Sequence, residues 1–425
     1  MEKKYINQKH GKKNMVKNKN WQRKKLREIC EEIEKKKAPV GTIPYIEIGN
    51  IDVSSKKIIF TEKGAVNGSV FAPENSILIS RVRPTRGAVV LLDKKMAVSS
   101  AFTIIEPKSN YNPKLLFYFL AWNKKFFDYL GEKQKGTNYP SVREDEILEF
   151  EVAVPENNGI QQKIVKILDT IQEAVEVQEK IIEKTKELKK ALMNLLFHYG
   201  LAGLRIKELV GLLVDELTSS EIKKLGLKLK KTEIGEIPEH WEVVRLGDKK
   251  LFELIMGQSP PSISYNQNKK GLPFLQGKAE FGEIYPQPIK WCDKPIKVAE
   301  KNDVLISVRA PVGDLNLADQ KYCIGRGLAS IRLKNNVNPF FLFNCLNFFK
   351  NQILTYGTGS TFKAITKEIL ENFKIPLPPL SEQKEIAEIL QTIDQKIEIE
   401  KKKKELYEEL FKALLNKIMN QEIDI

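Results

Sequence analysis

Side chains of the types that carry out covalent or metal chemistry are few in this chain of 425 residues. Its three histidines, His10, His198 and His240, lie far apart in sequence, and its four cysteines show no CxxC spacing, which argues against a metal centre or a disulfide framework. The phosphate-binding pattern G-x-x-x-x-G-K-[ST] is absent, so we expect no ATP hydrolysis. These patterns indicate a binding protein that holds no metal or cofactor of its own.

The chain carries a positive charge that a polyanion would complement. Seventy lysines and arginines against 55 acidic residues give a net charge of +15 and a pI of about 9.3, which is typical of nucleic-acid-binding proteins. A lysine-rich thermophile surface is the alternative interpretation. Residues 1–30, with nine lysines and two arginines against Glu2 and Glu28, form either a phosphate-contacting arm or a disordered leader.

Loop residues with guanidinium, amide, ammonium or hydroxyl groups are the candidates for contacting a nucleic acid. Arginine can bind guanine with two hydrogen bonds, and asparagine or glutamine can bind adenine in the same way. The selected residues are Arg81, Arg83, Arg86, Asn138, Tyr139, Gln258, Ser259, Asn266, Lys269, Lys270, Arg309, Arg326, Thr358, Ser360, Thr361 and Lys363.

Some of these residues have a second interpretation. Arg81 and Arg309 each flank an apolar strand, where they could form structural ion pairs. The segment YGTGSTFK, residues 356–363, is either a turn ahead of a helix or a loop whose hydroxyls and lysine contact phosphate. Tyr139 and Trp291 fit the core or rim of a domain better than a base-stacking platform.

An internal duplication runs through the chain. Residues 147–171, ILEFEVAVPENNGIQQKIVKILDTI, match residues 369–393, ILENFKIPLPPLSEQKEIAEILQTI. Further pairs follow in the same order, among them WQRKKL with WEVVRL, ILISRVRP with VLISVRAP and NPKLLFYFL with NPFFLFNCL. A constant order at a nearly constant offset predicts two copies of one domain, each followed by a long helix.

The local patterns predict the elements of each copy. Short apolar runs bounded by Pro and Gly, such as SILIS and AVVLL, predict strands. NPKLLFYFLAW and NPFFLFNCLNF predict buried helices with Asn as the cap and Pro at the first position. One long helix is expected from Ile160 to about Phe197 and another after Ser381 as a plausible N-cap. Heptad spacing gives each helix an apolar face, with these residues chosen for the interface: Ile164, Ile171, Ile181, Ile386, Ile393 and Ile397.

The two long helices are expected to pair antiparallel. A parallel pair would make residues 201–232, of which IKELVGLLVDEL looks helical, span about 60 Å. The predicted fold is mixed α+β, with two similar globular domains separated by two long antiparallel helices and an internal pseudo-two-fold repeat. The expected parts are residues 1–157 (first domain), 158–200 (first helix), 201–232 (linker), 233–379 (second domain) and 380–425 (second helix).

Several segments together resemble the specificity subunit of type I restriction–modification enzymes. They are TEIGEIPEHWEVVRLGD (232–248), GQSPP (257–261), GLPFLQGK (271–278), VLISVRAPVG (304–313) and the segment 357–390, which contains PLPPLSEQKEIAEIL. The first copy departs from this pattern, because PENNGIQQKI replaces PPLSEQKEI. The resemblance implies two target-recognition domains that bind a split double-stranded DNA sequence, and two conserved helices.

The resemblance also implies partners. Two methyltransferase subunits and further restriction subunits would bind this chain and supply the chemistry, with S-adenosylmethionine, ATP and Mg used in those subunits. A fused methyltransferase or nuclease enzyme and a structural coiled-coil interaction protein are the alternatives. No run of 18 or more apolar residues and no signal peptide are found, so a cytoplasmic location without a membrane is expected.

Overall fold

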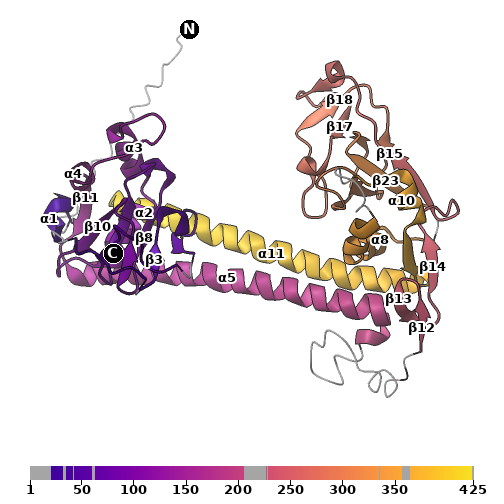
Figure 1. The fold of residues 1–425 in the computed structure, drawn as a ribbon, viewed down its shortest axis with the longest axis horizontal. Coiled ribbons are helices and arrows are strands. Elements are labelled where there is room, and N and C mark those ends of the chain that lie inside the picture. Colours follow the sequence, from indigo (N-terminus) through magenta and orange to yellow (C-terminus); the bar gives the residue numbers. More distant parts are fainter. Residues whose placement is uncertain are drawn as a thin grey trace, which may run out of the picture. The chain divides into compact units, whose positions relative to one another are not determined.

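The computed structural model describes residues 21–31, 35–41, 43–59, 63–204, 226, 228–334, 336–356 and 364–423. They divide into two compact units (Figure 1). Unit 1 lies within Met1–Glu179 and Lys402–Ile425, and unit 2 is Lys180–Lys401. Helices α5 (Asn158–Tyr199) and α11 (Leu380–Met419) each contribute one part to each unit. No helix formed by the described residues has the length and apolar character that a membrane crossing requires.

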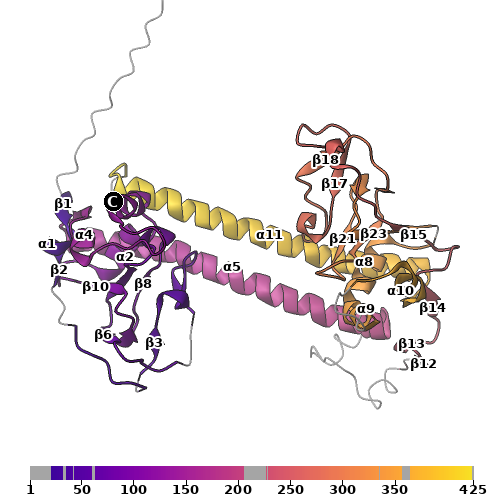
Figure 2. The ribbon, with the colours of Figure 1, turned by 45° about the horizontal axis from the view of Figure 1, so that its top comes forward.

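Unit 1 contains two main sheets and short helices. The antiparallel four-stranded sheet has the order β2 (Cys30–Glu31), β10 (Phe102–Pro107), β7 (Ile77–Ser80), β8 (Val89–Leu91). The three-stranded sheet has the order β3 (Tyr45–Ile46), β9 (Met96–Val98), β6 (Val70–Ala72) and lies farther from the long helices (Figure 2). The remaining elements are β1 (Trp21–Lys25) with β11 (Glu151–Pro155), β4 (Ile51–Asp52) with β5 (Lys57–Ile58), α1 (Leu26–Ile29), α2 (Pro113–Ala121), α3 (Lys124–Lys133), α4 (Glu144–Leu148), and the 3-10 turns η1 (Ile48–Asn50) and η2 (Pro84–Arg86).

Unit 2 repeats this plan with additions. Its four-stranded sheet has the order β15 (Phe252–Met256), β23 (Leu328–Leu333), β20 (Val304–Ser307), β21 (Leu315–Leu317). Its second sheet has the order β16 (Tyr265–Asn266), β18 (Lys290–Cys292), β17 (Leu272–Leu275), β22 (Tyr322–Ile324), β19 (Val298–Ala299). The remaining elements are β12 (Leu229–Thr232) with β13 (Gly235–Pro238), β14 (Glu242–Arg245) with β24 (Lys374–Leu377), α8 (Pro339–Phe348), α9 (Lys350–Tyr356), α10 (Lys367–Asn372), and the 3-10 turns η3 (Ser262–Ser264) and η4 (Lys278–Glu280).

The predicted duplication is visible in the order of the strands. The sheet order β2-β10-β7-β8 of unit 1 corresponds to β15-β23-β20-β21 of unit 2. Each unit also contains one parallel pair in its second sheet, β3 with β9 and β17 with β22. The runs SILIS and AVVLL contain β7 and β8, as predicted. The fold class is therefore mixed α+β with two copies of one domain plan.

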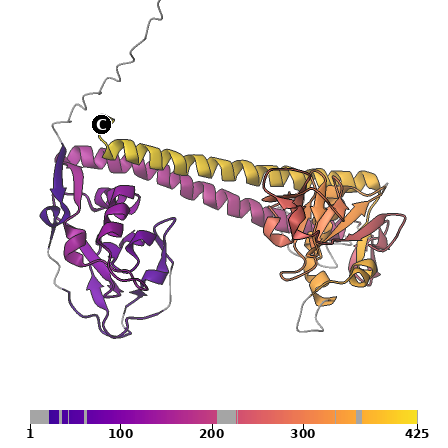
Figure 3. The same ribbon diagram turned by 90° about the horizontal axis from the view of Figure 1, so that it is seen from above.

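The two long helices run antiparallel, which confirms the prediction. In unit 1, Ile164 near the start of α5 shares a core with Phe411 and Leu415 near the end of α11. In unit 2, Leu196 near the end of α5 shares a core with Ile386 near the start of α11. The helices lie side by side within each unit (Figure 3). The linker stretch IKELVGLLVDEL, residues 206–217, is outside the described residues.

The buried face of α5 differs in part from the set of residues that was predicted for the interface. Ile164, Leu168, Val175 and Ile182 are buried, as a heptad pattern requires. Ile181, one of the residues chosen for the interface from sequence, is 38% exposed. Adjacent residues on a helix point about 100° apart, because a turn holds 3.6 residues. Burial of Ile182 therefore turns Ile181 toward solvent.

The short helices begin where the sequence predicted, but α11 does not. The Asn112 side chain accepts hydrogen bonds from the backbone N–H groups of Lys114 and Leu115, at 2.9 and 3.2 Å. Asn338 accepts one from Phe341 at 3.0 Å. The predicted N-cap Ser381 is wrong, because α11 begins at Leu380 and includes it.

A buried glutamine joins the start of each long helix to its own domain. Gln161 Oε1 accepts from Asn112 N at 2.7 Å, and its Nε2 donates to the carbonyl oxygens of Asn110 and Pro155 at 3.0 and 2.9 Å. Gln383 makes the same three bonds to Asn338 N, Asn336 O and Pro378 O, at 2.8, 3.0 and 2.8 Å. Both side chains are buried. The same amide thus ties the helix, the preceding turn and the α2 or α8 cap together in both units.

Replacing Gln161 by Leu is expected to destabilise unit 1 by about 2 kcal/mol, because it leaves the buried carbonyl of Pro155 and the half-buried N–H of Asn112 without their partner. Gln162→Leu is the matched control, since Gln162 is exposed, and should change stability by no more than about 0.5 kcal/mol. Urea unfolding of both variants measures the difference. Equal midpoints would contradict the assigned role of the Gln161 amide.

Candidate nucleic-acid interface

Two loops of unit 1 bring five of the predicted contact residues together. The arginine loop, residues 81–87, follows β7, and the tyrosine loop, residues 134–141, follows α3. Backbone bonds join them: Arg83 N donates to Pro140 O at 2.7 Å, and Val142 N donates to Arg81 O at 3.0 Å. Arg81, Arg83, Arg86, Asn138 and Tyr139 therefore lie on one joined pair of loops.

Arg83 and Tyr139 form a stacked pair at this junction. The guanidinium carbon of Arg83 lies 5.2 Å from the centre of the Tyr139 ring, and the backbone of Arg83 has φ 48° and ψ 52°. A residue other than glycine in this left-handed region is uncommon and costs about 1–2 kcal/mol, a kind of strain that clusters at functional sites. Tyr139 is 73% exposed, so it is not a core residue. The stack holds a planar donor group at the surface.

The other two arginines of the loop differ in exposure. The Arg81 side chain donates to Ser100 O, its Nε is buried without a hydrogen-bond partner among the described residues, and its backbone N donates to Ala101 O at 2.9 Å. Arg81 therefore has a structural role. It bonds to the carbonyl oxygen of Ser100 and does not form the ion pair that the sequence suggested. Arg86 is exposed at the end of the 3-10 turn Pro84–Arg86. Arg86 is the exposed arginine of this loop, and Arg83 is half-buried, with its guanidinium on the Tyr139 ring.

A buried lysine that sequence reasoning missed lies beneath the arginine loop. Lys56 Nζ donates to Gly87 O at 2.7 Å and lies 5.4 Å from the centre of the Phe127 ring. Asp52 shapes the turn that presents Lys56, because its carboxylate accepts bonds from Ser54 N, Ser54 Oγ and Ser55 Oγ. Burial lowers the pKa of Lys56 to about 8. No short-range motif marks this lysine, since its partner is 31 residues away.

In unit 2, four predicted residues meet around the turn Gly325–Gly327. Gln258 N donates to Ile324 O at 3.0 Å, and Arg326 N donates to Ser259 Oγ at 3.1 Å. Val308, which precedes Arg309, donates its N–H to Gly327 O at 2.8 Å. The side chains of Gln258, Arg309 and Arg326 are exposed, whereas Ser259 bonds inward to Gln276 and the backbone. This cluster offers two guanidinium groups and one amide.

The three predicted residues of the loop before β17 are engaged within unit 2. Asn266 closes its own turn, because Nδ2 donates to Lys270 O at 2.9 Å and Oδ1 accepts from Lys270 N at 3.0 Å. Lys269 Nζ lies 5.7 Å from the centre of the Trp291 ring, and Lys270 Nζ lies 3.8 Å from Asp293 Oδ2. Both lysines are exposed. Thr358, Ser360, Thr361 and Lys363 are outside the described residues.

The predicted interface isoleucines fall into three groups by exposure. Ile164, Ile386 and Ile397 are buried within their own units, so they stabilise the fold and present no surface to a partner. Ile171 and Ile393 are partly buried, and Ile181 is exposed. Exposed apolar side chains of the long helices that the heptad spacing did not identify include Val177, 54% exposed, and Ile399, 51% exposed, together with Leu406 and Leu410. Val177 and Ile399 are 222 positions apart, the offset of the duplication, which could have identified them.

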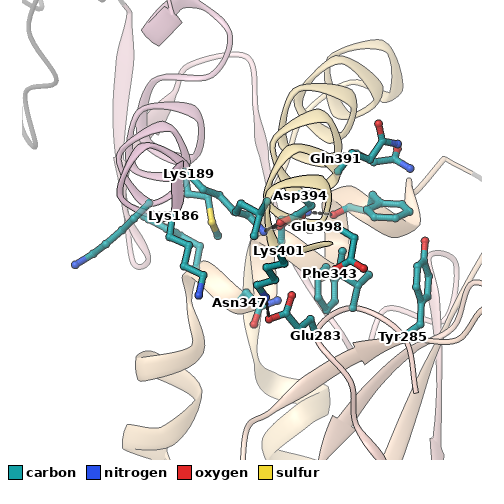
Figure 4. A pocket seen from close by; sticks show the side chains of 18 of the residues that line it. Lys186, Lys189, Glu283, Tyr285, Phe343, Asn347, Gln391, Asp394, Glu398 and Lys401 are labelled. Atoms are coloured by element: carbon teal, nitrogen blue, oxygen red, sulfur yellow. Dashed lines mark hydrogen bonds and ion pairs between the residues drawn. The ribbon is translucent and has the colours of Figure 1, made fainter. Parts of the chain in front are cut away.

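A cavity of about 1420 Å³ opens in unit 2 between its parts of the long helices and α8 (Figure 4). An ion pair spans the two helices there, with Lys189 Nζ 2.7 Å from Asp394 Oδ1, and Lys401 pairs with Glu283. No group of three or more metal-ligating side chains occurs among the described residues. The cavity is built from paired charges, amides and aromatic rings.

Comparison with known proteins decides the family. Residues 18–187 and 238–409 match the model of the type I restriction modification DNA specificity domain. The chain belongs to this family. It is therefore a DNA-recognition subunit and not a catalytic one, and the alternatives of a fused enzyme and a structural coiled-coil protein are not supported.

Individual relatives agree with this assignment. The chain is 44% identical over 321 residues to the putative type I restriction enzyme MjaX specificity subunit of Methanocaldococcus jannaschii, covering 75% of this chain and 70% of the relative. It is 28% identical over 418 residues to the MjaVIII specificity subunit of the same organism, covering 93% and 88%.

Solved structures share the fold. One chain, from a study of complex assembly and conformational transition of the type I R-M system, is 29% identical with a TM-score of 0.61, covering 94% of this chain and 98% of its own. The S subunit of the type I system of M. genitalium is 17% identical with a TM-score of 0.58, covering 95% and 97%, and supports the fold alone.

The lowered pKa of Lys56 predicts a specific pH dependence of stability. Between pH 8 and 10.5 the unfolded chain keeps the Lys56 proton and the folded chain has released it, so stability rises with pH in this window. Relative to Lys56→Met, which cannot titrate, the native protein should gain at most about 3 kcal/mol across it. Paired unfolding measurements at pH 7.5 and 10.5 test this. A constant difference between the two proteins would contradict the burial of an ionisable Lys56.

Proposed function

We propose that this specificity subunit recognises a split DNA sequence, with one half-site for each repeat. The arginine loop and the tyrosine loop of unit 1 bind one half-site, and the cluster of Gln258, Arg309 and Arg326 binds the other. The supporting observation is that equivalent strands, β7 and β20, lead into exposed arginines in both units. The two sets of side chains differ, so the two half-sites differ in sequence.

In this proposal residues 1–157 and 233–379 are the target-recognition domains, and residues 158–200 and 380–425 are the helices, joined by the linker 201–232. Arg83 binds a guanine edge with two hydrogen bonds, supported by its stack on Tyr139. Arg86, Lys269 and Lys270 bind phosphates and so position the protein without carrying sequence information. Asn138 and Gln258 are the amides exposed for adenine. The helices, of 42 and 40 residues, fix the length of the unread spacer.

The proposed partners are two methyltransferase subunits and restriction subunits, acting together in the cytoplasm. S-adenosylmethionine, ATP and Mg are used in those subunits, and this chain contributes binding. The surfaces proposed for the two methyltransferases are the exposed faces around Val177 and Ile399, because exposed apolar side chains at equivalent positions of a repeat suit two copies of one partner.

Replacing residues 233–379 by the corresponding segment of a related specificity subunit is expected to change one half of the methylated motif only. The reason is that each half-site is bound by its own domain. Sequencing of methylated positions in cells that carry the hybrid measures both halves. A change in both halves together would mean that the sequence is recognised by one composite surface.

Introducing a charge at the proposed docking faces should remove methyltransferase subunits one at a time. Val177→Asp and Ile399→Asp are each expected to give complexes with one methyltransferase, and the double variant complexes with none. Because both side chains are exposed, the free energy of unfolding of each variant should stay within about 0.5 kcal/mol of that of the unmodified chain. Native mass spectrometry of co-expressed complexes gives the stoichiometry. Two methyltransferases retained in the double variant would place the docking surface elsewhere.

A further inference from the structure

Lysine ammonium groups hold the loop that follows the equivalent strand in each unit. In unit 1, Lys56 Nζ donates to Gly87 O at 2.7 Å. In unit 2, Lys278 Nζ lies 2.5 Å from Asp314 Oδ2, and Lys350 Nζ contacts Asp314 Oδ1. Burial acts to raise the pKa of Asp314, but the bonds from the two lysines hold it below its usual range. The Asp314 carboxylate is therefore ionised where the lysines meet it.

These contacts fall at the same corner of the two loops. Ser80 N donates to Ala88 O at 2.9 Å, and Ser307 N donates to Asp314 O at 2.8 Å, so Ala88 and Asp314 correspond. The residues just before them, Gly87 and Gly313, have φ values of 81° and 82°, which glycine adopts without steric cost. Each loop thus closes through a left-handed glycine, and a lysine binds at or next to it.

Lys56 lies in an environment unlike that of a lysine that binds phosphate from the protein surface. Its side chain is buried, with Phe127 and Trp122 rings 5.4 and 6.0 Å from Nζ. A Cβ atom added to Gly87 would lie 3.0 Å from Lys56 Nζ, so the ammonium fills the space under the loop. A hydrogen bond donated by a charged group is stronger than one between two neutral groups. This contact therefore favours one conformation of the loop that carries Arg83 and Arg86.

We infer that Lys56 in unit 1, and Asp314 with Lys278 and Lys350 in unit 2, are positioning residues that fix the DNA-contacting arginine loops, and that the buried Lys56 does not itself contact DNA. The inference rests on the proposed function of Arg83, Arg86 and Arg309. These lysines would then affect half-site discrimination indirectly, through the conformation of the loops that carry the arginines.

Limited trypsin cleavage of the full chain tests the anchoring without DNA. Lys56→Met should speed cleavage after Arg86 by about tenfold or more, in line with the loss of a charged hydrogen bond, and leave cleavage after Arg309 unchanged. Asp314→Ala gives unit 2 the residue that unit 1 has at this corner. It should speed cleavage after Arg309 and leave cleavage after Arg86 unchanged. Gly87→Ala keeps Lys56 but disturbs its contact with the loop, and should also speed cleavage after Arg86. It serves as the second variant if Lys56→Met folds poorly.

DNA binding by the chain assembled with its methyltransferase partners tests the role in recognition. Lys56→Met should lose discrimination at one half-site and keep the salt dependence of binding. Arg86→Met, which removes an exposed cation from the same loop, should lower the slope of log K against log salt concentration by about 0.9. A similar loss of slope in Lys56→Met would make Lys56 a phosphate contact and overturn the inference.

Two further outcomes separate this inference from the proposed function. Unchanged cleavage after Arg86 in both Lys56→Met and Gly87→Ala would overturn the anchoring. Faster cleavage combined with unaltered half-site discrimination in Lys56→Met and in Arg83→Ala would leave the anchor in place but contradict the proposal that this loop recognises DNA.

Discussion

The amide of one buried glutamine at the start of each long helix is the contact on which the arrangement of this protein depends. Gln161 and Gln383 each use the acceptor and the donor of one side chain to bind three backbone groups of their own unit. Because a buried polar group without a partner is costly, the helix can begin in one orientation only. The direction of each long helix relative to its own domain is set at that point.

Each helix then contributes to a second core. Phe411 and Leu415 of α11 pack in unit 1 with α2, where the Phe411 ring lies 5.1 Å from the Trp122 ring. Leu196 and Phe197 of α5 pack in unit 2, where the Phe197 ring lies 5.7 Å from the Phe341 ring. The apolar face of each helix is therefore shared between its own repeat and the other one. Without the other repeat, the part of each helix that packs in the second core would lose its apolar neighbours.

Local signals in the sequence predicted the fold well, and contacts between distant residues set the limits of that prediction. Asn112 and Asn338 were identified because a cap and the proline after it lie within a few positions. The duplication and the antiparallel helices followed from matching order and length. The anchoring Lys56, the exposure of Tyr139 and the outward position of Ile181 depend on neighbours that are remote in sequence. Arg81 and Asn266 were candidates by type, yet their hydrogen bonds to nearby carbonyls give them structural positions.

In the proposed function, each repeat recognises its own half of a split DNA sequence. The most direct measurement is the map of methylated positions in cells that carry Arg83→Ala or Arg309→Ala in the complete restriction–modification system. We expect Arg83→Ala to relax the motif at one half-site and Arg309→Ala to relax it at the other, with the spacer length unchanged. Relaxation of the same half by both variants, or of both halves by either one, would contradict it.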